Sequence, residues 1–128
     1  MRGKRDKLML FGDDYPTPDG SCIRDYIHIL DLAQAHELAL HAPRSGHYNL
    51  GTSKGLSNFE IIRAAERVTG KKVNYEIAPR RPGDPASLIA CSDLVRAELN
   101  WKPRFESAEA IIESAWKWQL KFPEGYAK

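Results

Sequence analysis

The stretch that decides the fold is Phe11–Asp31, FGDDYPTPDGSCIRDYIHILD. Its first half, residues 13–21, holds two prolines, one glycine and three aspartates, a composition that predicts a loop. In residues 22–29 apolar and polar side chains alternate at a period of two, interrupted by Asp25, and this alternation predicts a short extended segment. One face of that segment carries three isoleucines, and the other carries Arg24, Tyr26 and His28.

Short strands and helices are predicted on both sides of this stretch. Residues 8–11 form an apolar run ended by Gly12, which is typical of a buried strand. Asp31 is a predicted N-cap for a helix that continues to about His41, because aspartate oxygens accept hydrogen bonds from the first helical amides. Residues 47–51, HYNLG, are predicted to form another short strand.

The second half of the chain carries clearer helix signals. Ser57 and Glu60 match a capping box, and the helix that follows ends at Gly70. Further predicted elements are a strand at 73–78, a loop at 79–85, a short helix capped by Ser92 and a last helix capped by Ser107. Short strands that alternate with helices predict an α/β (α+β-like) fragment, and 128 residues suffice for a single domain over 1–128.

Composition narrows the class of protein. A net charge of +2 is too small to indicate a nucleic-acid surface, since acidic residues match the basic ones along the chain. No apolar run is long enough to span a bilayer, so no membrane partner is expected. Cys22 and Cys91 stand in no metal or redox spacing, which favours a reducing, cytoplasmic compartment.

No pattern in the chain indicates a catalytic centre. The sequence holds no glycine-rich phosphate loop, and none of its five tyrosines is followed by a lysine four residues later. The four histidines show no signature of a nucleophile with its base. We interpret His28 and His36 as structural histidines, and the tryptophans Trp101, Trp116 and Trp118 as packing residues.

The strongest anion-site candidate is the loop 78–86, APRRPGDPA. It places two adjacent arginines between prolines, and the planar guanidinium of arginine forms paired hydrogen bonds with phosphate. Asp84 is suited to accept hydrogen bonds from sugar hydroxyls. The alternative is a solvated turn closed by an arginine–aspartate pair. Arg24 has the same two interpretations, a phosphate ligand or a partner of Asp25.

At these residues the chain resembles the UDP-glucose 4-epimerases, a family of extended short-chain dehydrogenases/reductases. The matching pieces are LFGDDYPTPDGSCIRDYIHILDLAQAH, HYNLGTSKG, APRRPGDPASLIACSD, ELNWKPR and WKWQLKFPEGY, in the family's order and together from about residue 6 to residue 126. The resemblance covers only the C-terminal part of that family's chain, without the main Rossmann half. It therefore implies a UDP-sugar-binding portion.

The resemblance also implies roles for eight residues. Met9, Leu10 and Phe11 would line the uracil. Arg24 and Arg81 would contact the diphosphate, and Asp84 the ribose. Two further contributors to substrate binding would be Tyr26 and Asn58.

In the full-length family NAD is bound by a glycine-rich turn, and a Tyr-x-x-x-Lys pair carries the proton and hydride chemistry of galactose metabolism. Because this chain has neither feature, we expect no cofactor in the chain itself and no turnover by the chain alone. A Rossmann-domain partner or a homo-oligomer would cover its open surface. The alternative is a free-standing nucleotide-binding or protein-interaction module derived from that family and lacking catalysis.

Overall fold

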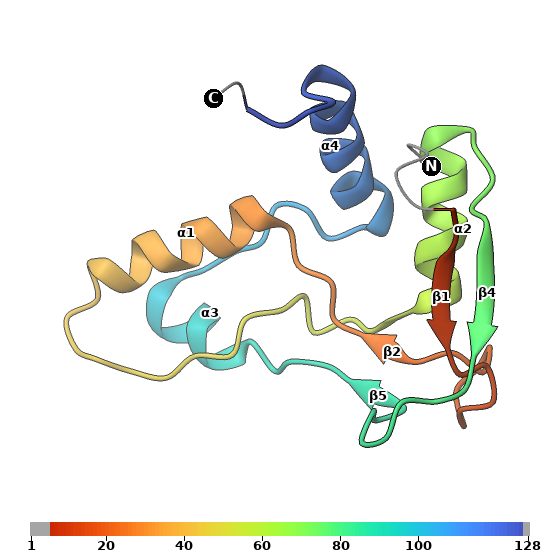
Figure 1. Cartoon of the computed structure of the whole chain (residues 1–128). Helices are drawn as coiled ribbons and strands as arrows, with labels where there is room; N and C mark the ends of the chain where they lie inside the picture. Colours follow the sequence, from red (N-terminus) through yellow and green to blue (C-terminus); the bar gives the residue numbers. More distant parts are fainter. Residues whose placement is uncertain (1–5, 127–128) are drawn as a thin grey trace.

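The structure is a computed structural model that describes residues 6–126 (Figure 1). Helices and short strands alternate along the chain, which confirms the predicted α/β class. In order, the elements are β1 (Leu8–Phe11), β2 (Ile23–Arg24), α1 (Ile29–Leu40), β3 (Leu56–Ser57), α2 (Asn58–Thr69), β4 (Tyr75–Ala78), β5 (Ser87–Leu88), α3 (Asp93–Leu99) and α4 (Ala108–Lys121).

Two small sheets frame one end of the molecule. Strand β1 pairs in parallel with β4, so that Leu8 lies opposite Tyr75 and Phe11 opposite Ala78. Strand β2 lies between β3, to which it runs antiparallel, and β5, to which it runs parallel. Helix α2 lies alongside the β1–β4 pair (Figure 1), and the ring of Phe59 meets that of Tyr75 edge-on with centroids 5.8 Å apart.

The core at the other end forms around Trp101, which is completely buried and packs with Ala35 of α1 and Val95 of α3. The indole Nε1–H donates a hydrogen bond of 2.9 Å to the backbone carbonyl of Asp31, so the one polar atom of the ring is satisfied. This arrangement confirms that Trp101 is a packing residue. It also fixes the position of α1 relative to the chain that follows α3.

The start of α1 differs from the prediction. The N-cap is His28, whose Nδ1 accepts a hydrogen bond of 3.0 Å from the amide of Leu30, so the prediction of Asp31 as N-cap is wrong. Asp31 is fully buried, and its carboxylate accepts hydrogen bonds from the amides of Arg104 and Phe105 at 2.9 and 3.0 Å. The Asp31 carboxylate, which the sequence predicted to cap the helix, therefore binds the backbone of residues 104–105 instead.

His28 is a structural residue, as its position in the sequence suggested. Its ring is buried and stacks on that of Phe105 with centroids 3.8 Å apart. Its Nε2 lies 2.8 Å from the hydroxyl oxygen of Ser114 on α4. Both ring nitrogens thus have partners, and the histidine joins the start of α1 to α4.

The predicted strand at 47–51 is wrong, since these residues form no ladder with any other described residue. A strand needs a neighbour for its amides and carbonyls, and here the carbonyl of Gly51 accepts a hydrogen bond of 2.7 Å from the Ser92 hydroxyl instead. That bond also explains why Ser92 stands at the N-cap of α3 without a side-chain cap hydrogen bond. Strand β4 begins two residues later than predicted, at Tyr75, and the extended segment 22–29 contains only two strand residues.

The caps predicted for α2 and α4 are confirmed. Ser57 and Glu60 make both bonds of the capping box, and Gly70 ends α2 in the left-handed conformation with φ of 65°. The hydroxyl of Ser107 accepts a hydrogen bond from the amide of Ala110 at 3.2 Å. No helix among residues 6–126 combines the length and the apolar character that crossing a membrane requires.

Candidate functional site

A cavity of about 450 Å³ opens between β1, β2, the start of α2 and the loop after β4. Its volume lies in the range usual for small-molecule sites. All eight residues singled out from the sequence face it, together with Leu8, Cys22, Ile61 and Ile62, which the sequence analysis missed. The structure thus brings together side chains that come from four separate stretches of the chain. The eight are Met9, Leu10, Phe11, Arg24, Tyr26, Asn58, Arg81 and Asp84.

The apolar wall of the cavity comes from β1 and α2. Leu10 is buried, whereas Met9 is exposed and Phe11 is half-buried. The guanidinium carbon of Arg81 lies 4.8 Å from the centre of the Phe11 ring, a cation–π arrangement that orients both side chains. A flat apolar surface therefore lies directly beside a positive charge.

The charged end of the cavity is a cluster of two arginines around one carboxylate. Arg24 Nη2 lies 2.5 Å from Asp84 Oδ1, and Arg24 Nη1 donates a hydrogen bond of 2.6 Å to the carbonyl of Ile23. Arg81 binds the other oxygen of Asp84 through Nη2 at 2.9 Å and Nε at 3.3 Å. Hydrogen bonds from Arg81, followed by those from Arg24, hold the pKa of Asp84 below its ordinary value even though burial opposes this shift.

Arg24 does not pair with Asp25. The Asp25 carboxylate accepts hydrogen bonds from the amide and hydroxyl of Thr52, at 2.8 and 2.7 Å, and from the amide of Ser53 at 3.0 Å. Asp25 therefore holds the turn after residue 51, and Arg24 is directed to the cavity. Of the two interpretations of Arg24, the pair with its neighbour is contradicted.

The two adjacent arginines of the loop 79–85 separate. Arg80 forms an ion pair of 2.6 Å with Asp14, and its guanidinium lies 4.2 Å from the centre of the Tyr15 ring. Arg80 does not line the cavity, whereas Arg81 does. Only one arginine of the pair is therefore available to a ligand held in the cavity.

Tyr26 and Asn58 face each other across the cavity wall. The Tyr26 hydroxyl donates a hydrogen bond of 2.9 Å to Oδ1 of Asn58. Burial raises the pKa of Tyr26, so its hydroxyl keeps its proton and acts as a donor at neutral pH. This bond fixes the orientation of the Asn58 amide at the start of α2.

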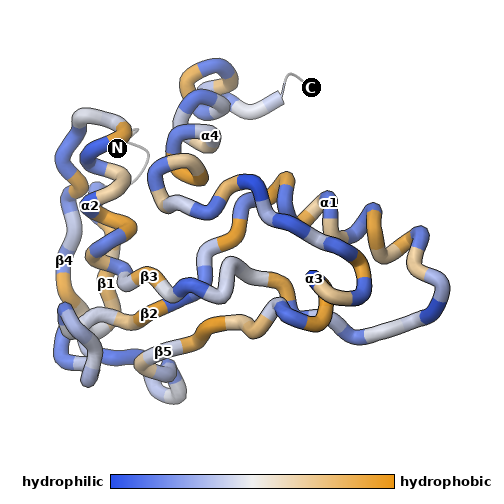
Figure 2. Tube along the Cα trace, turned by 180° about the vertical axis from the view of Figure 1, so that it is seen from behind, coloured by the Kyte–Doolittle hydropathy of each residue, from blue (hydrophilic) through white to orange (hydrophobic). Residues whose placement is uncertain are grey.

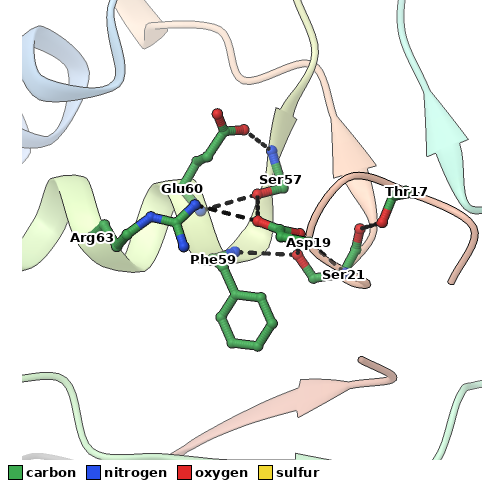
Figure 3. A network of polar contacts seen from close by, with 7 residues as sticks. All are labelled: Thr17, Asp19, Ser21, Ser57, Phe59, Glu60 and Arg63. Carbon is green, nitrogen blue, oxygen red and sulfur yellow. Dashed lines mark hydrogen bonds and ion pairs between the residues drawn. The ribbon is translucent and has the colours of Figure 1, made fainter. Parts of the chain in front are cut away.

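A polar network ties the loop 13–21 to the same helix start (Figure 3). Asp19 Oδ1 accepts hydrogen bonds from the amide and hydroxyl of Ser21 at 3.1 and 2.8 Å. Asp19 Oδ2 lies 2.5 Å from the Ser57 hydroxyl and 3.3 Å from Nη2 of Arg63. The sequence analysis missed Asp19. Aspartate commonly accepts a hydrogen bond from the amide two residues later in a turn, so the bond between Asp19 and Ser21 could have been predicted from the sequence.

Among residues 6–126, no group of three or more histidine, cysteine, aspartate or glutamate side chains is placed to hold a metal ion. The side chains that line the cavity are suited to hold a ligand. The cavity presents an apolar surface, two guanidinium groups, one carboxylate and one amide. Such a combination suits a ligand with a flat base, anionic phosphates and hydroxyl groups.

Comparison with known proteins identifies relatives of this chain. Residues 1–51 match the NAD dependent epimerase/dehydratase family. The UDP-glucose 4-epimerase of Streptococcus mutans is 53% identical over 98% of this chain, and that of Halalkalibacterium halodurans is 51% identical over 98%. The chain spans about 39% of the length of these relatives.

Solved structures show the same likeness. A crystal structure of a UDP-glucose 4-epimerase superimposes with a TM-score of 0.93 at 49% identity, covering 99% of this chain and 40% of the other. The UDP-glucose 4-epimerase from Bifidobacterium longum, solved in complex with NAD+ and UDP, gives a TM-score of 0.88 at 39% identity, covering 97% of this chain and 38% of the other.

Fold and sequence together place the chain in the NAD dependent epimerase/dehydratase family. Within that family its relatives are UDP-glucose 4-epimerases, and it corresponds to a C-terminal portion of them. The resemblance inferred from the sequence motifs is thereby confirmed.

Proposed function

We propose that residues 1–128 form a single unit that binds the UDP part of a UDP-sugar and serves as the C-terminal portion of a UDP-glucose 4-epimerase. The observation that carries this proposal is the gathering of all eight predicted residues around one cavity. Residues from β1, β2, α2 and the loop after β4 converge there, although they are separated by up to 75 positions in the sequence, from Met9 to Asp84.

Each part of the cavity matches a part of UDP. The wall formed by Met9, Leu10 and Phe11 suits the uracil ring, which has an apolar face. Arg24 and Arg81 suit the diphosphate, since guanidinium groups bind phosphate through paired charge-assisted hydrogen bonds. Asp84 suits the ribose hydroxyls. The related epimerase from B. longum was solved with UDP bound, which supports this choice of ligand.

The activity proposed for the whole enzyme is the interconversion of UDP-glucose and UDP-galactose in galactose metabolism. NAD would be held by parts of the family's chain that these residues do not include. The present chain would contribute binding energy remote from the reacting sugar carbon, which orients the sugar for reaction. We expect no turnover from this chain alone, and we place the enzyme in the cytoplasm.

An open apolar surface supports the proposal that another polypeptide covers this chain. Hydrophobic residues recur along α1 (Figure 2), where Ile29 is 69% and Leu40 is 85% exposed. A groove between the start of α1 and α4 is lined largely by apolar side chains, Leu30 and Trp118 among them. A Rossmann-domain partner fits this surface, and a second copy of the chain is the alternative.

The test of the binding site compares the two neighbouring arginines of one loop. Arg81→Ala is expected to weaken UDP binding by about tenfold or more, because charge-assisted hydrogen bonds to the phosphates are lost. Arg81→Lys should recover only part of the loss, since an ammonium group lacks the planar fork. Arg80→Ala, the matched control, should leave UDP affinity within about twofold, because Arg80 pairs with Asp14 outside the cavity.

Affinity is to be measured by calorimetric titration of UDP, with the chain alone and with the chain fused to the N-terminal part of a related epimerase. The unfolding midpoint of each variant serves as the check on folding. Equal UDP affinity for Arg81→Ala and the unmodified chain in both settings would contradict the proposed site.

A further inference from the structure

Arg24 and Arg81, the two arginines that we assign to the diphosphate, both form ion pairs with Asp84. Asp84 bridges them, with Oδ1 bound to Arg24 and Oδ2 bound to Arg81. The Asp84 side chain is only 14% exposed and that of Arg24 only 22%, whereas Arg81 is 61% exposed. The Arg24–Asp84 contact is therefore shielded from water, and an anion that enters the cavity meets a carboxylate in the place between the two guanidinium groups.

The backbone holds Asp84 in this place. Its amide donates a hydrogen bond of 3.2 Å to the carbonyl of Arg81, which closes a tight turn at Pro82 and Gly83. Pro85 follows directly, and proline restricts the backbone on both sides of itself. The backbone of Asp84 is therefore held beside Arg81, and its carboxylate changes partners by rotation of the side chain alone.

The net charge of the cluster formed by Arg24, Arg81 and Asp84 determines how strongly it binds an anion. Two guanidinium groups and one carboxylate leave a net charge of +1, so Asp84 cancels half of the attraction that the arginines exert on an anion. A bare diphosphate brings negative charge that repels Asp84, and it carries no sugar hydroxyl to offset this repulsion. A nucleoside diphosphate also brings ribose hydroxyls, and these donate hydrogen bonds to a carboxylate that has lost its arginine partners.

We propose that Asp84 is an internal counter-anion that makes the arginine pair select a diphosphate carrying a ribose over a bare diphosphate. In the unliganded chain it fills the anion position. In the complex it exchanges its arginine partners for ribose hydroxyls. This inference rests on the proposed function and adds to it a preference for a nucleoside diphosphate over a bare diphosphate.

The test removes the charge of Asp84 and keeps its shape. Inorganic pyrophosphate and UDP are titrated into the unmodified chain, Asp84→Asn and Asp14→Asn at low ionic strength. Asp84→Asn should bind pyrophosphate about tenfold more tightly, because a repulsive charge a few ångströms away is removed. UDP should gain less or lose affinity, since an amide replaces the carboxylate that accepts the hydroxyl protons.

Asp14→Asn is the matched control, because Asp14 also pairs with an arginine of this loop but outside the cavity. Both affinities should stay within about twofold in that variant. Adding salt should shrink the gain of Asp84→Asn for pyrophosphate, as screening weakens the repulsion that the variant removes. Asp84→Ala, checked with Asp84→Asn by circular dichroism and thermal unfolding, provides a second neutral variant and should change the pyrophosphate affinity in the same direction.

The inference is overturned if pyrophosphate affinity is unchanged or falls in folded Asp84→Asn and Asp84→Ala, since Asp84 then only orients the arginines. It is also overturned if UDP and pyrophosphate gain equally. Failure of the proposed function gives a different result. In that case UDP binds neither the unmodified chain nor its fusion, independently of the affinity for pyrophosphate. UDP binding that Arg81→Ala abolishes, with unchanged selectivity in Asp84→Asn, supports the function and rejects this inference alone.

Discussion

Three aspartates connect segments that lie far apart in the chain, and each does so by accepting hydrogen bonds from several donors. Asp19 joins the loop 13–21 to the start of α2, Asp25 holds residues 52–53, and Asp31 holds residues 104–105. A carboxylate offers about four acceptor positions, so one side chain satisfies several backbone amides that would otherwise lack partners. The cavity residues Arg24, Tyr26 and Asn58 lie next to these aspartates or their partners in sequence, which fixes their positions.

Asp19 provides a test of this role through pH. Burial is the largest single influence on its pKa and raises it, but hydrogen bonds from Ser57, Ser21 and Arg63 together outweigh burial and lower the pKa below 3.8. A lowered pKa in the folded state means that ionised Asp19 stabilises the fold fully above the unfolded-state pKa. The stabilisation is lost as the pH falls through the folded-state pKa.

Asp19→Asn is therefore expected to lower the free energy of unfolding at pH 7 by about 1.5–3 kcal/mol, the usual contribution of a hydrogen bond to a charged group. The difference from the unmodified chain should begin to shrink as the pH falls below the ordinary aspartate pKa of about 3.9, where the unfolded state takes up the proton first, and should disappear below the lowered pKa of folded Asp19. Urea unfolding at pH 7 and pH 2.5 measures both values, with Asp13→Asn, an exposed aspartate of the same loop, as control. A difference that stays constant with pH would contradict this account.

At the scale of elements, prediction from the sequence succeeded where the signal was local. The start and end of α2 follow from Ser57, Glu60 and Gly70, whose side chains or φ angles act within one turn of the helix. It failed at residues 47–51, because a strand requires a pairing partner that no local pattern reveals, and at Asp31, whose carboxylate binds residues more than 70 positions away.

The candidate site divides in the same way. Residue types suited to UDP were recognisable from the sequence and its family resemblance, and all eight do share one cavity. The direction in which each side chain points could not be predicted from the sequence. Arg80 and Arg81 are chemically identical neighbours, and only the folded turn separates them into a partner of Asp14 and a partner of Asp84. The choice of Asp84 over Asp25 as the partner of Arg24 likewise depends on the pairing of β2 with β5.

The loop 13–21 depends on Gly20, which has a φ of 80°. A Cβ atom at this position would lie 1.9 Å from the backbone oxygen of Asp13, a distance that no relaxation of a side chain relieves. Gly20→Ala should therefore lower the free energy of unfolding by about 3 kcal/mol or more, as backbone strain and overpacking add.

Gly70→Ala is the matched control for that prediction. Gly70 also has a positive φ, 65°, but an added Cβ would meet no atom within 4 Å, so its cost should be only about 1 kcal/mol. Urea unfolding of both variants measures the two costs. Similar costs for the two substitutions would show that the loop adapts and that contact with Asp13 does not fix it.

At the scale of the whole molecule, the chain combines the candidate cavity with an exposed apolar surface on α1. The cavity draws together residues from β1 to the loop after β4, while α1 exposes Ile29 and Leu40. A groove of about 560 Å³ lies between α1 and α4. Large exposed apolar side chains favour association. This exposed surface supports the proposal that another polypeptide covers the chain.

The strongest test of the whole proposal is to supply that polypeptide. The purified chain is mixed with a polypeptide comprising the rest of the S. mutans UDP-glucose 4-epimerase, the relative that is 53% identical over this region. Conversion of UDP-galactose to UDP-glucose with NAD is expected from the mixture and from neither piece alone, because binding of the UDP part here orients the sugar for chemistry carried out by the other piece.

Arg81→Ala should reduce the conversion at low substrate concentration by about tenfold, and Arg80→Ala should leave it nearly unchanged. Co-sedimentation shows whether the two pieces associate. Association without conversion would limit this chain to a binding module, and conversion by the chain alone would show that its own residues carry the chemistry.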